Sequence, residues 1–248
     1  MPDLKVSKPA PGGSMIRPYG FDDGYGTLGA TIEWCGRIVS VTCAHVAHAV
    51  GLEVFHPAQF VKHSYAVGTV HSISARTVYS SAEAYLESPD RTDSLFDFAV
   101  IEPEPGAVSY AIPGIYDGKS ALRHRNPVLF EEVVFRGASG RVIEARVGSM
   151  REWGSASLPS YIKGGPAPLE TFANSFHVEF KGSLRPTPGD SGSAIVARKD
   201  NRVVGLFTAG GEGDSVGSAT RIPDNGDEMK RTQKGISLEM AKRLLGLD

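Results

Sequence analysis

The chain has 248 residues, enough to bury a sizeable core in one large domain or in two small ones. Its hydrophobic content of 41% and charged content of 22% are ordinary for a soluble globular protein, and its net charge of -2 gives no reason to expect nucleic acid or an acidic membrane surface as a partner. No apolar run approaches the roughly 20 residues that span a bilayer. Residues 1–15 are polar and lack the apolar segment of a secretory signal.

The first half of the chain predicts a β-barrel. Residues 1–25 are rich in Pro and Gly, and we expect an N-terminal extension that is mobile or lies over the surface. Short runs of β-branched and apolar residues then alternate with turn residues, which is typical of strands. The predicted strands are residues 27–34, 37–42, 66–79 and 95–101. We therefore expect an N-terminal barrel over residues 26–118.

The second half repeats this pattern after a Pro- and Gly-rich connection at residues 103–126. Strands are predicted at residues 131–136, 141–147, 175–180, 194–197, 202–208 and 217–222. Many strands without interleaved helices favour antiparallel barrels or sandwiches, so the fold class is all-β, with a C-terminal barrel over residues 119–222.

The chain ends in a polar loop and a predicted helix, together residues 223–248. Within residues 236–247, apolar residues recur at the spacing of one helix face, namely Ile236, Met240, Leu244 and Leu247. A helix with one apolar face is expected to cover a barrel.

The two cysteines, Cys35 and Cys43, are too few for a disulfide framework. Together with the missing secretory signal they favour a reducing compartment, and we expect a cytoplasmic location. A single bridge between the two and two free, buried cysteines both remain open.

The run Pro188-Gly189-Asp190-Ser191-Gly192-Ser193 presents a serine as a nucleophile requires. Glycines on both sides allow a sharp turn that leaves the hydroxyl accessible. A serine hydroxyl is a weak nucleophile until a nearby base removes its proton, and that base needs an acid to fix its tautomer. His45 and Asp97 are the candidates for base and acid.

Three motifs together resemble the trypsin/chymotrypsin-like serine protease superfamily, in particular its minimal intracellular, bacterial and viral branches and the HtrA-type proteases. They are Val41-Thr42-Cys43-Ala44-His45-Val46, Asp97-Phe98-Ala99-Val100-Ile101, and the serine loop with the following strand Val203-Val204-Gly205-Leu206-Phe207-Thr208. Their order, His, Asp, Ser, is that of this superfamily. The resemblance spans residues 26–222. It implies two antiparallel six-stranded β-barrels and a cofactor-independent serine endopeptidase acting on protein or peptide substrates.

The resemblance also implies a role for each residue. Ser191 attacks the scissile carbonyl, His45 moves the proton and Asp97 orients the imidazole. The backbone N–H groups of Gly189 and Ser191 hold the oxyanion. Thr208 supports the acid, and with Ala209 and Gly210 it forms an edge that pairs with an extended substrate.

Each assignment has a competitor. His48 follows His45 closely, and with Cys43 the two histidines form a Cys-x-His-x-x-His string of metal-ligand type, for which no convincing fourth ligand is found. Asp90 and Asp93 compete with Asp97, which is preferred because an apolar strand follows it. A catalytically silent, peptide-binding relative remains the alternative function, whereas the order of the motifs argues against an esterase-like hydrolase.

Two residues depart from the pattern of the digestive members. Their acid before the nucleophile pairs with a freshly cleaved N-terminus, which is not visible here. Asp190 therefore needs another partner or is solvated, and no zymogen cleavage is expected. Arg185 stands six residues before the nucleophile, where the base of the primary pocket is expected, and would favour an acidic substrate side chain. Yet Phe207 replaces the histidine of glutamate-specific relatives, and Arg185 pointing to solvent is the alternative.

The segment 133–142 resembles the Gly-rich hairpin that opens the second barrel of such proteins. A tight turn that needs glycine is the preferred interpretation.

Overall fold

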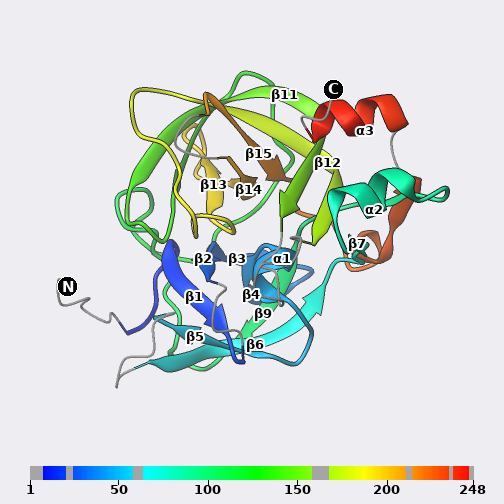
Figure 1. The fold of residues 1–248 in the computed structure, drawn as a ribbon. Helices are drawn as coiled ribbons and strands as arrows, with labels where there is room; N and C mark the ends of the chain where they lie inside the picture. The colour runs from blue at the N-terminus through cyan, green and yellow to red at the C-terminus, as the bar shows by residue number, and fades with distance from the viewer. Residues whose placement is uncertain are drawn as a thin grey trace.

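Two curled β-sheets make up most of the protein, as the computed structural model shows in Figure 1. The structure describes residues 8–20, 25–57, 64–157, 168–210, 214–234 and 237–245. The helical segments are short: α1 (Ala44–Ala47), α2 (Ala82–Glu87), the 3-10 turn η1 (Glu228–Lys230) and α3 (Leu238–Leu244). Within the described residues, no helix has the length and apolar character needed to cross a bilayer.

The first sheet has seven strands, all paired antiparallel. Its order is β2 (Gly26–Leu28), β1 (Ser14–Pro18), β5 (Glu53–His56), β6 (Tyr65–Ile73), β9 (Ala99–Pro103), β4 (Arg37–Thr42) and β3 (Ala30–Trp34). Its two end strands, β2 and β3, are separated only by Gly29, so one bent stretch of chain brings the two ends of the sheet together. A side chain at position 29 would overlap the carbonyl groups of Gly192 and Val41, which explains the glycine.

The second sheet has nine strands. Its path is β11 (Val142–Ser157), β10 (Glu132–Arg136), β13 (Ala194–Ala197), β14 (Val203–Ala209), β15 (Val216–Thr220), β12 (Leu169–Phe180), β8 (Thr92–Ser94) and β16 (Thr232–Lys234), with β7 (Val78–Tyr79) beside β12. Direct pairing of β11 with β12 closes β10 to β15 into a ring. β7, β8 and β16 extend it, and β8 pairs with β12 in parallel.

The buried apolar residues form two main clusters, of which the first extends from the first sheet to strands β10, β13 and β14 of the second. Phe98, Val41, Val54 and Ile101 are among the fully buried residues of the first. The second contains four phenylalanine rings, those of Phe135, Phe176, Phe180 and Phe207. Phe135 stacks on Phe207 at 5.0 Å between centroids, and Phe180 packs against both. Burial of the apolar residues on the inner face of each curled sheet therefore stabilises both sheets.

Every predicted strand overlaps an observed one, but several elements were missed. Ser14–Pro18, expected within a surface extension, forms β1 and pairs with β2 and β5. The hairpin β11–β12 continues far beyond the predicted strand ends, through residues whose polar composition gave no strand pattern. Helix α2 was also missed, although Ser81 is a helix cap whose side chain accepts a hydrogen bond from the N–H of Ala84.

The C-terminal helix exists, but its predicted buried face is wrong at Met240. Met240 is 49% exposed, whereas Ala241 is fully buried and packs with Leu245 in the cluster around Tyr85. Ile236, Leu247 and the side chain of Leu244 lie outside the described part of the structure. The helix is turned by about one residue because it packs against α2 and β11, which the sequence pattern does not contain.

Both cysteines are free. Cys43 is buried at the end of β4, as expected of a small apolar residue, whereas Cys35 is exposed in the turn between β3 and β4. The predicted alternative of two buried cysteines is therefore correct only for Cys43.

The extended hairpin is fixed to the first half of the chain by Asp93, a fully buried carboxylate on β8. One of its oxygens accepts hydrogen bonds from the hydroxyls of Tyr85 at 2.9 Å and Thr171 at 2.5 Å, and the other accepts one from the indole N–H of Trp153 at 2.8 Å. One carboxylate thus accepts hydrogen bonds from three elements, α2, β11 and β12.

Replacing this carboxylate is expected to destabilise the fold. Asp93→Ala leaves three donors without their acceptor, and we expect the free energy of unfolding to fall by about 3 kcal/mol in urea denaturation. The matched control is Asp90→Ala, at an exposed position, with an expected change below about 0.5 kcal/mol. Equal stability of the two variants would contradict this role of Asp93.

Candidate active site

The pairing of two strands brings His45 and Asp97 together. Strand β4 ends at Thr42, and the chain turns through Cys43 into α1, which carries His45 in its single turn. Thr42 is paired with Ala99, the first residue of β9, and Asp97 lies two residues before it. The register of β4 on β9 therefore places the two side chains at the same end of the first barrel.

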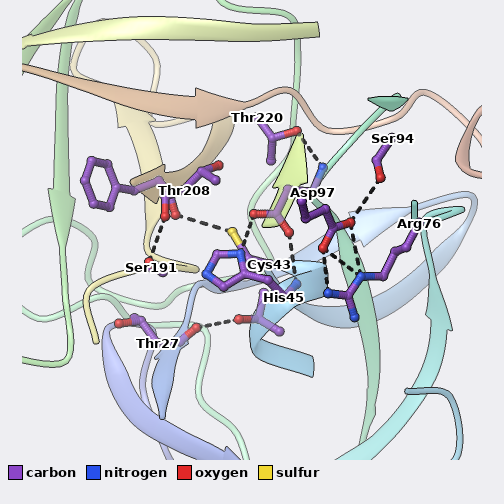
Figure 2. A network of polar contacts seen from close by, with 12 residues as sticks. Thr27, Cys43, His45, Arg76, Ser94, Asp97, Ser191, Thr208 and Thr220 are labelled. Carbon is purple, nitrogen blue, oxygen red and sulfur yellow. Dashed lines mark hydrogen bonds and ion pairs between the residues drawn. The ribbon is translucent and has the colours of Figure 1, made fainter. Parts of the chain in front are cut away.

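His45 and Asp97 make a two-point contact, drawn in Figure 2. The imidazole Nδ1 lies 2.6 Å from one carboxylate oxygen of Asp97, and the backbone N–H of His45 donates to the other at 3.0 Å. Asp97 is fully buried, whereas the side chain of His45 remains 12% exposed. The backbone N–H of Asp97 donates to Thr220 Oγ1 at 3.1 Å, which fixes the acid from β15. The imidazole thus keeps Nε2 available on its other side.

The contact changes the pKa of both groups. Burial by itself lowers the pKa of His45, but the charge and hydrogen bond of Asp97 outweigh it and raise the pKa above its ordinary value of 6.5. Burial raises the pKa of Asp97, yet the charge and hydrogen bonds of His45 outweigh it and lower this pKa. The pair therefore favours a charged imidazolium beside a carboxylate, the arrangement that a general base passes through when it has taken a proton.

Ser191 lies in a tight loop, flanked by Gly189 at φ +93° and Gly192 at φ +94°. These values belong to the left-handed region, which favours glycine at both positions. Ser191 is partly exposed, and its hydroxyl donates to the carbonyl of Thr208 at 2.8 Å. In Figure 2 the imidazole of His45 lies between Asp97 and Ser191. The loop contacts the end of β4 as well, since a Cβ at Gly192 would overlap the hydroxyl of Thr42.

Asp190, which needed a partner, is fully buried and receives hydrogen bonds from neutral groups. The N–H and hydroxyl of Thr187 donate to it at 2.8 and 3.2 Å, and the N–H and hydroxyl of Ser139 donate at 3.1 and 3.3 Å. A Cβ at Gly137 would overlap this carboxylate, so that glycine allows the hairpin between β10 and β11 to approach. The glycines of this hairpin serve close contact with Asp190 as well as the turn.

The expected substrate-binding residues lie in different surroundings. Phe207 is a core residue with 1% of its surface exposed, and its ring stacks on Phe135, so only its backbone reaches the site. Ala209 pairs with Ser218 of β15 at the end of β14, and Gly210 follows it. Thr208, expected to support the acid, offers its carbonyl to Ser191, and the hydroxyl of Thr220 accepts a hydrogen bond from the backbone N–H of Asp97.

Arg185 is partly exposed and donates to three backbone carbonyls, those of Asp214, Gly182 and Leu184, at 2.8 to 3.0 Å. It also lies over the ring of Phe180 at 5.6 Å. Arg185 is therefore not a buried, unpaired cation, and the physical reason for expecting an acidic substrate side chain is removed.

The alternative candidates for base and acid, His48, Asp93 and Asp90, lie in other surroundings. His48 ends α1, and burial, the charge of Arg76 and the neighbouring His45 lower its pKa to about 4. Asp93 is held by the hydrogen bonds of the extended hairpin, and Asp90 is exposed.

Cys43, His45 and Asp97 form a compact group of possible metal ligands, with ligand atoms within 4.8 Å of one another. Burial and the charge of Asp97 raise the pKa of Cys43 well above its ordinary value. Its thiol donates to the carbonyl of Phe207 at 3.3 Å. A protonated thiol of this kind does not fit a cysteine nucleophile, which must be a thiolate.

The sequence analysis missed a second buried acid beside the pair. Glu170 on β12 is fully buried, accepts three hydrogen bonds from Arg76 at 2.5 to 3.1 Å and one from Ser94 at 3.0 Å. Arg76 also donates to the carbonyl of His48, which connects this ion pair to the end of α1. The charge of Glu170 contributes to raising the pKa of His45, and that of Arg76 opposes it. Glu170 lies in the part of the hairpin for which no strand was predicted.

Neither a family model nor a curated protein matches this sequence. Among solved structures, the chain is similar to a chymotrypsin of Cellulomonas bogoriensis, with a TM-score of 0.53 and 14% identity over 86% of this chain and 91% of that chain. It is also similar to a glutamic acid specific serine protease reported to use a novel histidine triad in substrate binding, with a TM-score of 0.50 and 14% identity over 95% and 97% of the two chains. The chain has the trypsin/chymotrypsin-like fold. The predicted all-β class with two barrels is thereby confirmed, and identity this low carries the fold alone.

The pKa directions can be measured by NMR titration of the histidine rings. We expect the midpoint of His45 above 6.5 and that of His48 near 4. In Asp97→Asn the charge that raises the pKa of His45 is gone while its burial remains, so the midpoint of His45 should fall. An unchanged midpoint of His45 in this variant would contradict the assigned electrostatic pair.

Proposed function

We propose that this chain is a serine endopeptidase that hydrolyses peptide bonds with Ser191, His45 and Asp97, through an acyl-enzyme intermediate. The observation that carries the proposal is the 2.6 Å contact between the buried carboxylate of Asp97 and a partly exposed imidazole. The trypsin/chymotrypsin-like fold adds support for the reaction class. In this proposal residues 26–118 and 119–222 form the two barrels, and the first supplies base and acid while the second supplies the nucleophile.

The proton has a defined path in this mechanism. Nδ1 of His45 is held by Asp97, so Nε2 takes the proton of Ser191 as the hydroxyl oxygen bonds to the scissile carbonyl carbon. The imidazolium then gives that proton to the leaving amine as the C–N bond breaks. Water repeats the sequence, losing its proton to His45 as it attacks the acyl ester and releases Ser191.

Ser191 must change its hydrogen bond before this reaction. Its hydroxyl donates to Thr208 in the described state, and turning about the Cα–Cβ bond would direct it to His45 instead. An extended peptide that pairs with the edge at Thr208, Ala209 and Gly210 would use the same carbonyl as an acceptor. Substrate binding and release of the hydroxyl toward the base are thus linked.

The tetrahedral oxyanion needs donors that are free to receive it. Within the described part of the chain, the backbone N–H groups of Gly189 and Ser191 donate to no protein acceptor. We assign them as the oxyanion donors. Base, acid, nucleophile and donors are all groups of the chain, so the proposed reaction uses no cofactor, and its partners are protein or peptide substrates.

A fluorophosphonate probe tests for an activated serine. We expect it to label the folded protein at Ser191 and to leave Ser191→Ala unlabelled, with the labelled residue identified by peptide mass spectrometry. Ser193→Ala is the matched control, because Ser193 lies in the same loop but is buried and donates to the carbonyl of Asp190. Absence of labelling of folded wild-type protein between pH 6 and 9 would favour the alternative function, a catalytically silent peptide-binding module.

The base should be visible in the pH dependence of kcat/KM on a peptide substrate. Only neutral His45 can accept the proton, so activity should rise with pH through a single midpoint above 6.5, in line with the raised pKa of this group. Asp97→Asn should lower kcat on the order of 10⁴-fold. Asp93→Asn is the control, with kcat near wild type; the reverse result for these two variants would show that the acid is misassigned.

A further inference from the structure

Thr27, a fully buried residue of β2, contacts the nucleophile loop through its hydroxyl and its backbone N–H. Its hydroxyl donates to the carbonyl of Gly189 at 2.8 Å and accepts from the N–H of Ala138 at 3.0 Å. Its backbone N–H donates to the carbonyl of Ser191 at 2.8 Å, and its own carbonyl accepts from the hydroxyl of Thr42 at 2.8 Å. One residue therefore joins β2, the end of β4, the nucleophile loop and the hairpin between β10 and β11.

These bonds fix the loop at the two residues whose N–H groups are assigned to the oxyanion. Holding a carbonyl fixes the peptide plane that follows its residue, here the planes after Gly189 and after Ser191, and thereby restricts the ψ angle of each residue. Gly189, at φ +93°, belongs to the residue type with the greatest rotational freedom, so an outside contact is needed to keep one orientation. Thr27 supplies that contact at both positions.

The hairpin between β10 and β11, whose Ala138 N–H donates to Thr27, also binds the nucleophile loop. Ala138 donates to Thr27, and the next residue, Ser139, donates twice to the buried Asp190. Nucleophile loop, hairpin and β2 thus form a closed cycle of hydrogen bonds. Among the described residues, the donors to Asp190 are neutral N–H and hydroxyl groups, so the cycle holds the loop without using a cation.

We propose that Thr27 is a positioning residue. By holding the carbonyl of Gly189, its hydroxyl fixes the peptide plane that lies between the N–H groups of Gly189 and Ser191, in the orientation that lets both stabilise the oxyanion. The proposal rests on the proposed function, because it assigns a role within the same reaction. Thr27 touches neither substrate nor reacting atoms and acts through the loop. Its loss should therefore weaken transition-state stabilisation and leave ground-state substrate binding unchanged.

The test is Thr27→Val, which keeps the shape of the side chain and removes its hydroxyl. On a peptide substrate we expect kcat to fall at least about 10-fold, below the roughly 10²–10³-fold reported for loss of a direct oxyanion donor. KM should stay within about twofold, and the inhibition constant of a peptide boronic acid, which binds as a tetrahedral adduct, should rise by the same factor as kcat falls. Thr27→Ser retains the hydroxyl and should restore both values to within about threefold of wild type.

Thr31→Val is the matched control for general destabilisation. Thr31 is also a buried threonine of the first barrel, but its hydroxyl contacts Ser40 at 3.0 Å and the carbonyl of Ser109 at 3.3 Å, away from the loop. It should lower the midpoint of urea denaturation without changing kcat or boronic acid affinity. Where Thr27→Val does not fold, Thr27→Ala removes the same hydroxyl with less crowding and carries the same expectation.

The outcomes separate this proposal from the function on which it rests. An active wild type with unchanged kcat and boronic acid affinity in the folded Thr27 variant overturns the positioning role alone. So does an equal loss of kcat in Thr31→Val, since the effect would then be general. If wild type neither cleaves peptides nor reacts with the fluorophosphonate, the proposed function fails and this role fails with it.

Discussion

A buried carboxylate is stable as an anion only when donors surround it, and this requirement governs the region between the two barrels. Among the described residues, Asp93, Asp97, Glu170 and Asp190 are fully buried acids. Asp97 is compensated by His45, and Glu170 by Arg76. Asp93 and Asp190 are held by neutral hydroxyl, indole and backbone N–H groups. Each carboxylate thereby fixes the segments that supply its donors.

These contacts link parts of the chain that belong to different barrels. Asp97 precedes a strand of the first sheet, yet its backbone is held by Thr220 of the second. Glu170 comes from the extended hairpin of the second sheet and binds Arg76, which follows the first-sheet strand β6. The candidate catalytic groups therefore keep their mutual position only as long as both barrels are folded and docked.

The imidazole of His45 lies close to two buried carboxylates. Asp97 and Glu170 both favour the charged form of His45, and Arg76 and burial oppose it. The balance leaves the pKa of His45 raised, which is the direction that stabilises an imidazolium intermediate. Arg76 and Glu170 form one ion pair, and their charges affect the pKa of His45 in opposite directions. Removing either residue would leave its partner's charge without this compensation.

The sequence alone determined the strand pattern, the three motifs and the choice of His45, Asp97 and Ser191, because alternating apolar residues and glycine-flanked turns are local signals. For Asp190, the sequence and its resemblance left two alternatives, a partner within the chain or exposure to solvent. Only the tertiary structure decided that Ser139 and Thr187 are its partners, that Glu170 and Arg76 lie behind the acid, and that Thr27 binds the nucleophile loop. The same holds for Phe207, whose ring the second core buries, and for Arg185, whose guanidinium binds backbone carbonyls. The physical reason is distance along the chain: these partners are separated by tens of residues, and only the pairing and docking of the two barrels brings their donors and acceptors into contact.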